Sequence, residues 1–200
     1  MLKQCLAILL LITTTIYADS QAGFTFKNEP INPACVAMFN SGMADLPYIK
    51  SINMNVCQHS NAAYQKTLQA TDGSYYFNVN DKDDSEGQYS YKVIGKSANG
   101  IYVLSTQASG GGTMVASDLL LLRLNENLEY VFNRVSNPQI NNITVLRMLG
   151  YVNGGDRCVG GFAEVKLVGN QLNIKQYNGA NAVDCSKTKE FSLDLSKLPS

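Results

Sequence analysis

The first eighteen residues constrain the rest of the chain most, because they have the layout of a secretory signal peptide. Met1-Leu2-Lys3 gives a positive start, residues 5–16 form an uncharged run of apolar and small residues, and Tyr17-Ala18 places a small residue at the expected cleavage point. The apolar run is too short to span a bilayer comfortably. We therefore expect residues 1–18 to be removed and residues 19–200 to fold beyond a membrane, where disulfides persist.

Four cysteines remain after that cleavage: Cys35, Cys57, Cys158 and Cys185. An even number in an exported chain predicts two disulfides, and four cysteines allow three pairings. We favour Cys35–Cys57 and Cys158–Cys185, because each closes a short loop, which the loop-entropy model values at about 3 kcal/mol. Reduced thiols in a core are the alternative. We expect no metal and no cofactor, since the spacings lack C-x-x-C and His59 is the sole histidine.

The charge balance argues against nucleic acid as a partner. Loss of Lys3 with the signal leaves 15 basic and 16 acidic groups, a net charge of about −1. Such a chain has no strong field to attract nucleic acid or an anionic membrane. The sequence also has no second apolar segment of membrane length, so we expect no membrane span.

Composition and patterning favour a mainly β fold. The chain has 16 glycines, 11 tyrosines and many β-branched residues. Period-two alternation and apolar runs predict strands over residues 48–57, 74–79, 88–95, 100–106, 119–124, 129–135, 143–152, 162–168 and 171–177. We expect a single domain over residues 19–200, built as an antiparallel meander, sandwich or small barrel. A short N-terminal helical segment is predicted over residues 34–45, and an α+β fold is the alternative.

Several local signals complete this outline. The run 119–124 is apolar on both faces, which predicts a central strand covered on both sides, with a helix from Ser117 as the competing interpretation. Asn99-Gly100 and Gly169-Asn170 are strong turn pairs. Residues 125–127 are predicted as a further turn, 136–142 as a loop, and 61–69 as an ambiguous, helical or irregular segment.

The acidic loop at residues 80–87 resembles the start of a calcium loop. Asp81, Asp83 and Ser85 have the alternate spacing of such a loop, but the glycine comes one place late at Gly87 and the twelfth position is Lys92. We interpret it as a solvated loop, with weak calcium binding as the alternative.

The glycine-rich segment Ser109-Gly110-Gly111-Gly112-Thr113 is the leading candidate for binding. It is neither a P-loop nor a dinucleotide fingerprint, because no Gly-Lys-Ser/Thr follows and no strand-to-helix context surrounds it. A hairpin tip or bulge is the structural interpretation. As a binding loop, its backbone N–H groups can approach a partner without steric hindrance.

The most distinctive constellation is Gly-Gly-Asp-Arg-Cys at residues 154–158, followed by Val-Asp-Cys at 183–185. The structural interpretation is a hairpin region bridged by Cys158–Cys185, in which Asp156 fixes a turn. The functional interpretation makes Arg157 an outward guanidinium that recognises a carboxylate or phosphate.

The order of a triple-glycine turn, an apolar strand, Gly-Asp-Arg and Asp-x-Cys resembles a group of uncharacterised exported bacterial proteins and lipoproteins. The resemblance covers residues 89–188 and implies export and a β fold. The group has no established activity, so the resemblance implies none for this chain. This chain departs from the pattern because Ser186-Lys187-Thr188 follows Cys185, and because it lacks a lipid-anchor cysteine. We take a bacterial origin, and a periplasmic or secreted location, as the working interpretation.

No catalytic set is evident. No serine sits in a G-x-S-x-G elbow that could work with His59. Asp156, Glu164 and Asp184 lie near the second predicted disulfide, but spacing alone does not pair them. We therefore predict a binding or interaction module without catalysis of its own, in the manner of small enzyme inhibitors, whose partner is an unknown protein or envelope component. The alternative is a cell-envelope glycan or peptide hydrolase that uses carboxylates.

Overall fold

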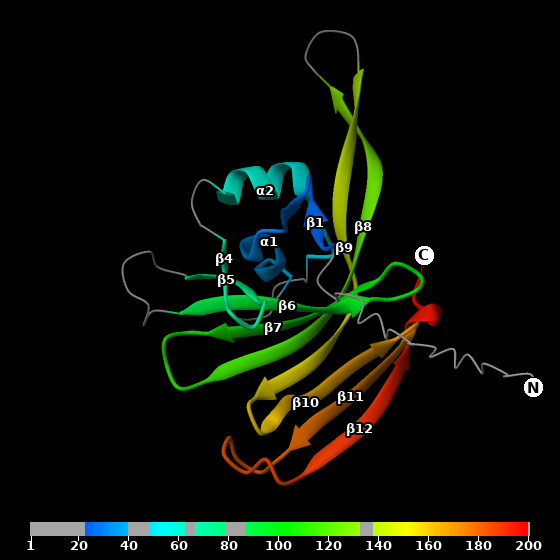
Figure 1. Ribbon diagram of the computed structural model, residues 1–200. Coiled ribbons are helices and arrows are strands. Elements are labelled where there is room, and N and C mark those ends of the chain that lie inside the picture. The colour runs from blue at the N-terminus through cyan, green and yellow to red at the C-terminus, as the bar shows by residue number, and fades with distance from the viewer. Residues whose placement is uncertain (1–22, 40–48, 63–66, 79–86, 133–137, 200) are drawn as a thin grey trace, which may run out of the picture.

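An open antiparallel sheet organises the computed structural model (Figure 1), which describes residues 23–39, 49–62, 67–78, 87–132 and 138–199. The strand order is β12-β11-β10-β9-β8-β7-β6-β5-β4, with β3 paired to β9, so nearly every strand pairs with its neighbour in sequence. This is a meander, and the mainly β, antiparallel prediction is confirmed. The strands are β1 Thr25–Phe26, β2 Glu29–Pro30, β3 Ser51–Asn53, β4 Leu68–Gln69, β5 Tyr75–Asn78, β6 Gln88–Lys96, β7 Tyr102–Ser109, β8 Val115–Phe132, β9 Pro138–Asp156, β10 Val159–Val168, β11 Gln171–Asn178 and β12 Thr188–Asp194. The helices are α1 Pro33–Ala37, α2 Met54–Ala62 and the 3₁₀ turn η1 Leu195–Lys197.

The meander packs in layers. In Figure 1, β10–β12 lie on one side of β6–β8, and α1, α2 and β1 lie on the other. Leu120 and Leu122 belong to the hydrophobic cluster under the N-terminal segment. Leu119 and Leu121 belong to the second cluster, formed with β10–β12. The leucine run is therefore covered on both faces, as its unbroken apolar pattern predicts, and the competing helix from Ser117 is wrong.

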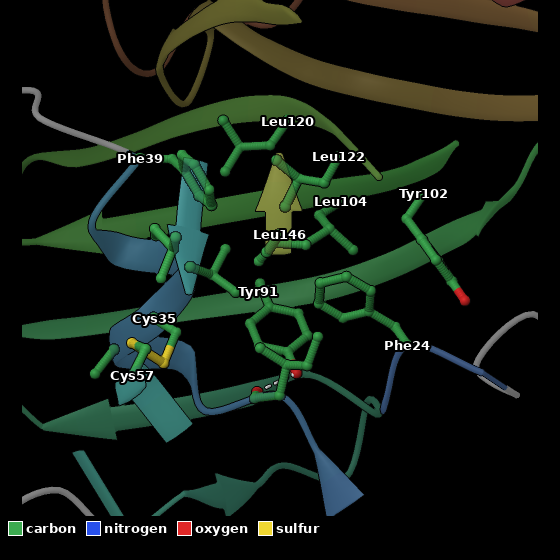
Figure 2. Packing of buried hydrophobic residues seen from close by; sticks show 14 of the residues in the cluster. Phe24, Cys35, Phe39, Cys57, Tyr91, Tyr102, Leu104, Leu120, Leu122 and Leu146 are labelled. Carbon is green, nitrogen blue, oxygen red and sulfur yellow. Dashed lines mark hydrogen bonds between the residues drawn. A yellow bond between two sulfur atoms is a disulfide. The ribbon is translucent and has the colours of Figure 1, made fainter. Parts of the chain in front are cut away.

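The N-terminal segment that packs over the sheet is held in place by a short capped helix and a disulfide. The Asn32 side chain accepts a hydrogen bond from the Ala34 backbone at 2.8 Å, and Pro33 occupies the first turn of α1, both typical of a helix start. Cys35 on α1 is bonded to Cys57 on α2, with the two Cα atoms 5.9 Å apart, and both are buried (Figure 2). The first predicted pairing is confirmed.

The strand predicted over residues 48–57 is mostly wrong. Only Ser51–Asn53 forms a strand, and helix α2 begins at Met54. The physical reason is local: the Asn53 side chain accepts from the Asn55 backbone N–H at 3.0 Å, which favours a helix start over continued extension. The disulfide therefore joins two helices, not a helix and a strand. Helix α1 ends at Ala37, so the helix predicted over 34–45 is shorter than expected, and residues 40–45 lie outside the described part.

Two buried tyrosines tie the N-terminal segment to the sheet. The Tyr91 hydroxyl on β6 donates to the carbonyl oxygen of Ile31 at 2.6 Å, the contact dashed in Figure 2. The Tyr102 hydroxyl on β7 donates to the carbonyl oxygen of Gly23 at 2.7 Å. Phe24 packs between these tyrosines, with ring centroids 5.6 and 5.0 Å away. Each buried phenol thus finds a backbone carbonyl as its hydrogen-bond partner.

Strands β8 and β9 are much longer than predicted. Residues 125–127 form no turn, because they stay paired with Val145, Thr144 and Ile143 on β9. Likewise β9 already begins at Pro138, inside the predicted loop 136–142, whereas residues 133–137 lie outside the described part. Beyond the body of the sheet the two strands continue as a projecting ribbon (Figure 1), on which Leu128 and Ile140 are 52% and 58% exposed.

Candidate functional site

A polar groove of about 590 Å³ lies on the face of β5, β6 and β7, next to the glycine-rich turn. We call it the β5–β7 groove. Its volume falls in the usual range of small-ligand sites, roughly 300–1,000 Å³. Its lining residues are Tyr76, Asn78, Gly87, Gln88, Ser90, Gln107, Ser109, Gly111, Gly112 and Val115.

Strand register places the polar side chains of the groove in two parallel rows. The first row crosses the strands as Tyr76, Ser90 and Gln107, since Tyr76 pairs with Ser90 and Ser90 with Gln107. The second row crosses them as Asn78, Gln88 and Ser109, by the same two pairings. Alternate residues of a strand share a face, so both rows point to the same side. The intervening residues, such as Phe77, Tyr89 and Tyr91, point to the opposite side and join the core.

Most of these groove side chains are available to a ligand. In the part of the chain that the structure describes, the side chains of Tyr76, Ser90, Gln107 and Ser109 make no hydrogen bond. The Gln88 amide makes one long contact, 3.4 Å to the Asn78 side-chain oxygen. None of them is fully buried, so water satisfies them until a ligand replaces it.

The glycine-rich segment forms the β7–β8 turn and one end of the groove. It lies at the end of the sheet opposite the C-terminus (Figure 1). Gly111 has φ +84°, a conformation that L-residues rarely adopt, so the turn itself requires this glycine. A Cβ on Gly110 or Gly112 would meet nothing within 4 Å. Of these two, only Gly112 lines the groove, so its lack of a side chain keeps the groove open.

Arg157 and the second disulfide lie near the same end of the sheet. Asp156 accepts from the Val115 backbone N–H at 3.1 Å, and Val115 follows the glycine-rich turn. Arg157 has φ +49°, its Nε lies 3.5 Å from Asp156 Oδ1, and its side chain is 44% exposed. Asp156 thus joins the end of β9 to the start of β8 and also lies beside Arg157 in the turn that follows. Arg157 does not line the β5–β7 groove.

The second predicted disulfide, Cys158–Cys185, is also confirmed. Its Cα atoms are 4.7 Å apart, and it fastens the loop after β11 to the β9–β10 turn. The Gly179 backbone N–H donates to the Cys158 carbonyl oxygen at 2.9 Å next to the bridge. Gly154 is required here, because a Cβ on it would collide with the Ser117 carbonyl oxygen. The disulfide thus stiffens the turn that carries Arg157.

Three carboxylates of the C-terminal strands and of the loop after β11 each have a different partner. Glu164 shares a hollow of about 250 Å³ with Glu190, but Glu164 pairs with Lys166, and Glu190 lies 3.0 Å from Lys175. The hydrogen bond from Lys166 lowers the pKa of Glu164. A hydrogen bond from the Ser186 hydroxyl likewise lowers the pKa of Asp184. These shifts are opposite to the raised pKa that a general acid needs.

Sequence reasoning missed most of the groove. It selected Ser109, Gly111 and Gly112, but not Tyr76, Asn78, Gln88, Ser90 and Gln107. Four of them occupy alternate positions of two predicted strands, and Gln107 comes just after the end of a third. On one sequence such a pattern is the same as that of an ordinary solvated face. Strand pairing, which brings the three segments together, is the missing information.

Comparison of the chain with protein-family models, curated proteins and solved structures finds no match. Within the described ranges, no helix is long and apolar enough to cross a bilayer. In the same ranges, no three His, Cys, Asp or Glu side chains gather at a possible metal position. The acidic segment 81–86 lies outside the described residues.

Proposed function

We propose that this is an exported bacterial binding protein without catalysis of its own, and that the β5–β7 groove is its ligand site. The observation that carries the proposal is the pair of polar rows, six uncharged side chains on three adjacent strands. Sites on paired strands hold their side chains in fixed positions, so little ordering is needed when a ligand binds. The two disulfides fit a periplasmic or secreted location, which forms part of the proposal.

The hydrolase alternative has less support. A carboxylate mechanism needs two acids in one cleft, one of them with a raised pKa. The two glutamates that share a hollow are instead each paired with a lysine. The described lining residues of the groove offer amides, hydroxyls and glycine backbone, which bind a ligand but supply no general acid or base near neutral pH.

A matched pair of glycine variants tests the groove. Gly112→Leu places a side chain at its end, whereas Gly110→Leu adds the same bulk to the same turn outside the lining. Neither glycine has a positive φ, so both variants should fold. The ¹⁵N-labelled, disulfide-bonded protein is titrated with uncharged probes of different classes: oligosaccharides, nucleosides and capped peptides.

We expect at least one class to shift the amide resonances of β5–β7, to lose this effect with Gly112→Leu, and to keep it with Gly110→Leu. Two results would contradict the proposal. One is a groove that none of the probes perturbs. The other is turnover of peptidoglycan or a peptide by the pure protein that disappears on changing a single carboxylate.

A further inference from the structure

We infer that the ligand of the β5–β7 groove is a neutral oligosaccharide. This inference rests on the proposed function and names the chemical class that the groove would take. Among the described residues that line it, none carries a charge. A phosphate, carboxylate or ammonium ligand would gain no opposite charge from these residues in return for its lost hydration, which is unfavourable. The described lining residues therefore favour a polar, uncharged ligand.

The hydrogen-bonding groups of the groove match sugar hydroxyls. The amides of Gln88 and Gln107 each have donors and an acceptor, and the hydroxyls of Ser90 and Ser109 both donate and accept. A sugar hydroxyl has the same dual character. Adjacent hydroxyls of one ring can therefore bond to neighbouring members of a row, whichever way each proton points.

Tyr76 adds an aromatic surface at the outer strand of the three. It begins the row that continues through Ser90 and Gln107, and its half-buried side chain lines the groove. Pyranose rings have a face of C–H groups that packs against an aromatic ring. A tyrosine supplies this apolar area together with a hydroxyl that remains polar. One aromatic ring beside a set of amides and hydroxyls therefore suits a sugar ring, which is apolar on its face and polar at its rim.

The dimensions agree with a short saccharide. Adjacent strands lie about 4.8 Å apart and alternate residues about 7 Å apart along a strand. The six side chains thus form a patch about 10 Å long and 7 Å wide. A volume of about 590 Å³ accommodates a few sugar rings. A Cβ on Gly112 would meet nothing within 4 Å, so the turn leaves unfilled space beside this end of the groove.

A peptide fits this surface less well. Peptides commonly add to a free sheet edge or insert alternate side chains into apolar pockets. Here the face belongs to β6, whose backbone already pairs with β5 on one side and β7 on the other. Beyond the tyrosine ring, Val115 is the one large apolar side chain among the described lining residues.

The experiment is calorimetry and ¹⁵N NMR of the disulfide-bonded protein with triacetylchitotriose, cellotriose and maltotriose as neutral probes. Trigalacturonic acid is the anionic probe, and the glucosamine trimer is the cationic one. We expect a neutral trisaccharide to bind and to shift resonances of β5–β7, and the charged trisaccharides to bind more weakly. Gln107→Leu should weaken binding about tenfold, as loss of one hydrogen bond does. Tyr76→Ala should weaken it by about tenfold or more.

Tyr177→Ala on β11 is the matched control, because Tyr177 is a half-buried strand tyrosine outside the groove. It should leave saccharide binding unchanged. If a nucleoside or capped peptide shifts the groove resonances and none of the neutral saccharides does, the saccharide inference is wrong and the groove remains the ligand site. If no probe of any class shifts them, both the saccharide inference and the proposed function are wrong.

Discussion

Asn99 and Asn170 hydrogen-bond to each other across the two layers of the sheet, although 71 residues separate them in sequence. The Asn99 backbone N–H donates to the Asn170 side-chain oxygen at 3.1 Å. The Asn99 side chain donates in turn to the Leu195 carbonyl oxygen at 2.9 Å, and the Leu195 backbone N–H donates to the Asn170 carbonyl oxygen at 2.8 Å. The β6–β7 turn, the β10–β11 turn and the C-terminal 3₁₀ turn are thereby locked together.

Replacing Asn99 should weaken these contacts between the three turns. Asn99→Ala loses the bond to Leu195 and the one accepted from the Ser97 hydroxyl at 2.6 Å, so we expect the free energy of unfolding to fall by about 1–3 kcal/mol. Asn127→Ala, on the projecting ribbon, is the control and should change it by less than about 0.5 kcal/mol. Urea unfolding measures both. Equal effects would show that the contact between turns adds nothing to stability.

Tyr91 should make the fold sensitive to alkali. Burial raises the pKa of the Tyr91 phenol above its usual value near 10. Above about pH 10 the unfolded chain releases this proton while the folded chain keeps it, so stability present below pH 10 is lost as the pH rises. Tyr91→Phe removes this penalty, but also the hydrogen bond to Ile31.

We therefore expect Tyr91→Phe to be less stable than the parent at pH 7 by about 1–2 kcal/mol. The gap should shrink between pH 10 and pH 11, as denaturant unfolding at each pH would show. A gap that stays constant over that range would mean that Tyr91 does not carry the alkaline sensitivity.

The two disulfides should differ in their resistance to reductant. Cys35 and Cys57 are both buried among the residues of the N-terminal cluster, whereas Cys185 is exposed. Because thiolate attack requires access to a sulfur, mild dithiothreitol should open Cys158–Cys185 first. Alkylation and peptide mapping over time would measure the order. Simultaneous loss of both bridges would instead indicate that reduction follows global unfolding.

Alanine substitutions at the three glycines of the β7–β8 turn should differ in their effect on stability, because only Gly111 has a positive φ. Gly111→Ala forces an L-residue to φ +84° and should destabilise the protein by about 1–2 kcal/mol. Gly110→Ala and Gly112→Ala have open space and no positive φ, so they should be neutral or slightly stabilising. Thermal unfolding of the three variants tests this. A large loss at Gly112 would mean that this position serves the hairpin and not the groove.

The sequence by itself determined the features that depend on local chemistry. The disulfide pairing follows from loop length, the doubly covered strand from the unbroken run Leu119–Leu122, and the turns at Gly100 and Gly169 from residues that tolerate positive φ. Where the local chemistry was ambiguous, the predictions failed. Asn53 began a helix inside an alternating pattern, and the polar residues 125–127 continued a strand because β9 pairs with them.

The groove was decided by tertiary structure alone. Tyr76, Ser90 and Gln107 come from three separate segments, and only strand register puts them in one row. A polar residue at every second position of a strand predicts that one face of the strand is exposed to water. It does not predict which other strands pair with it. Strand pairing depends on how the whole chain packs, and the sequence of a single strand does not reveal it.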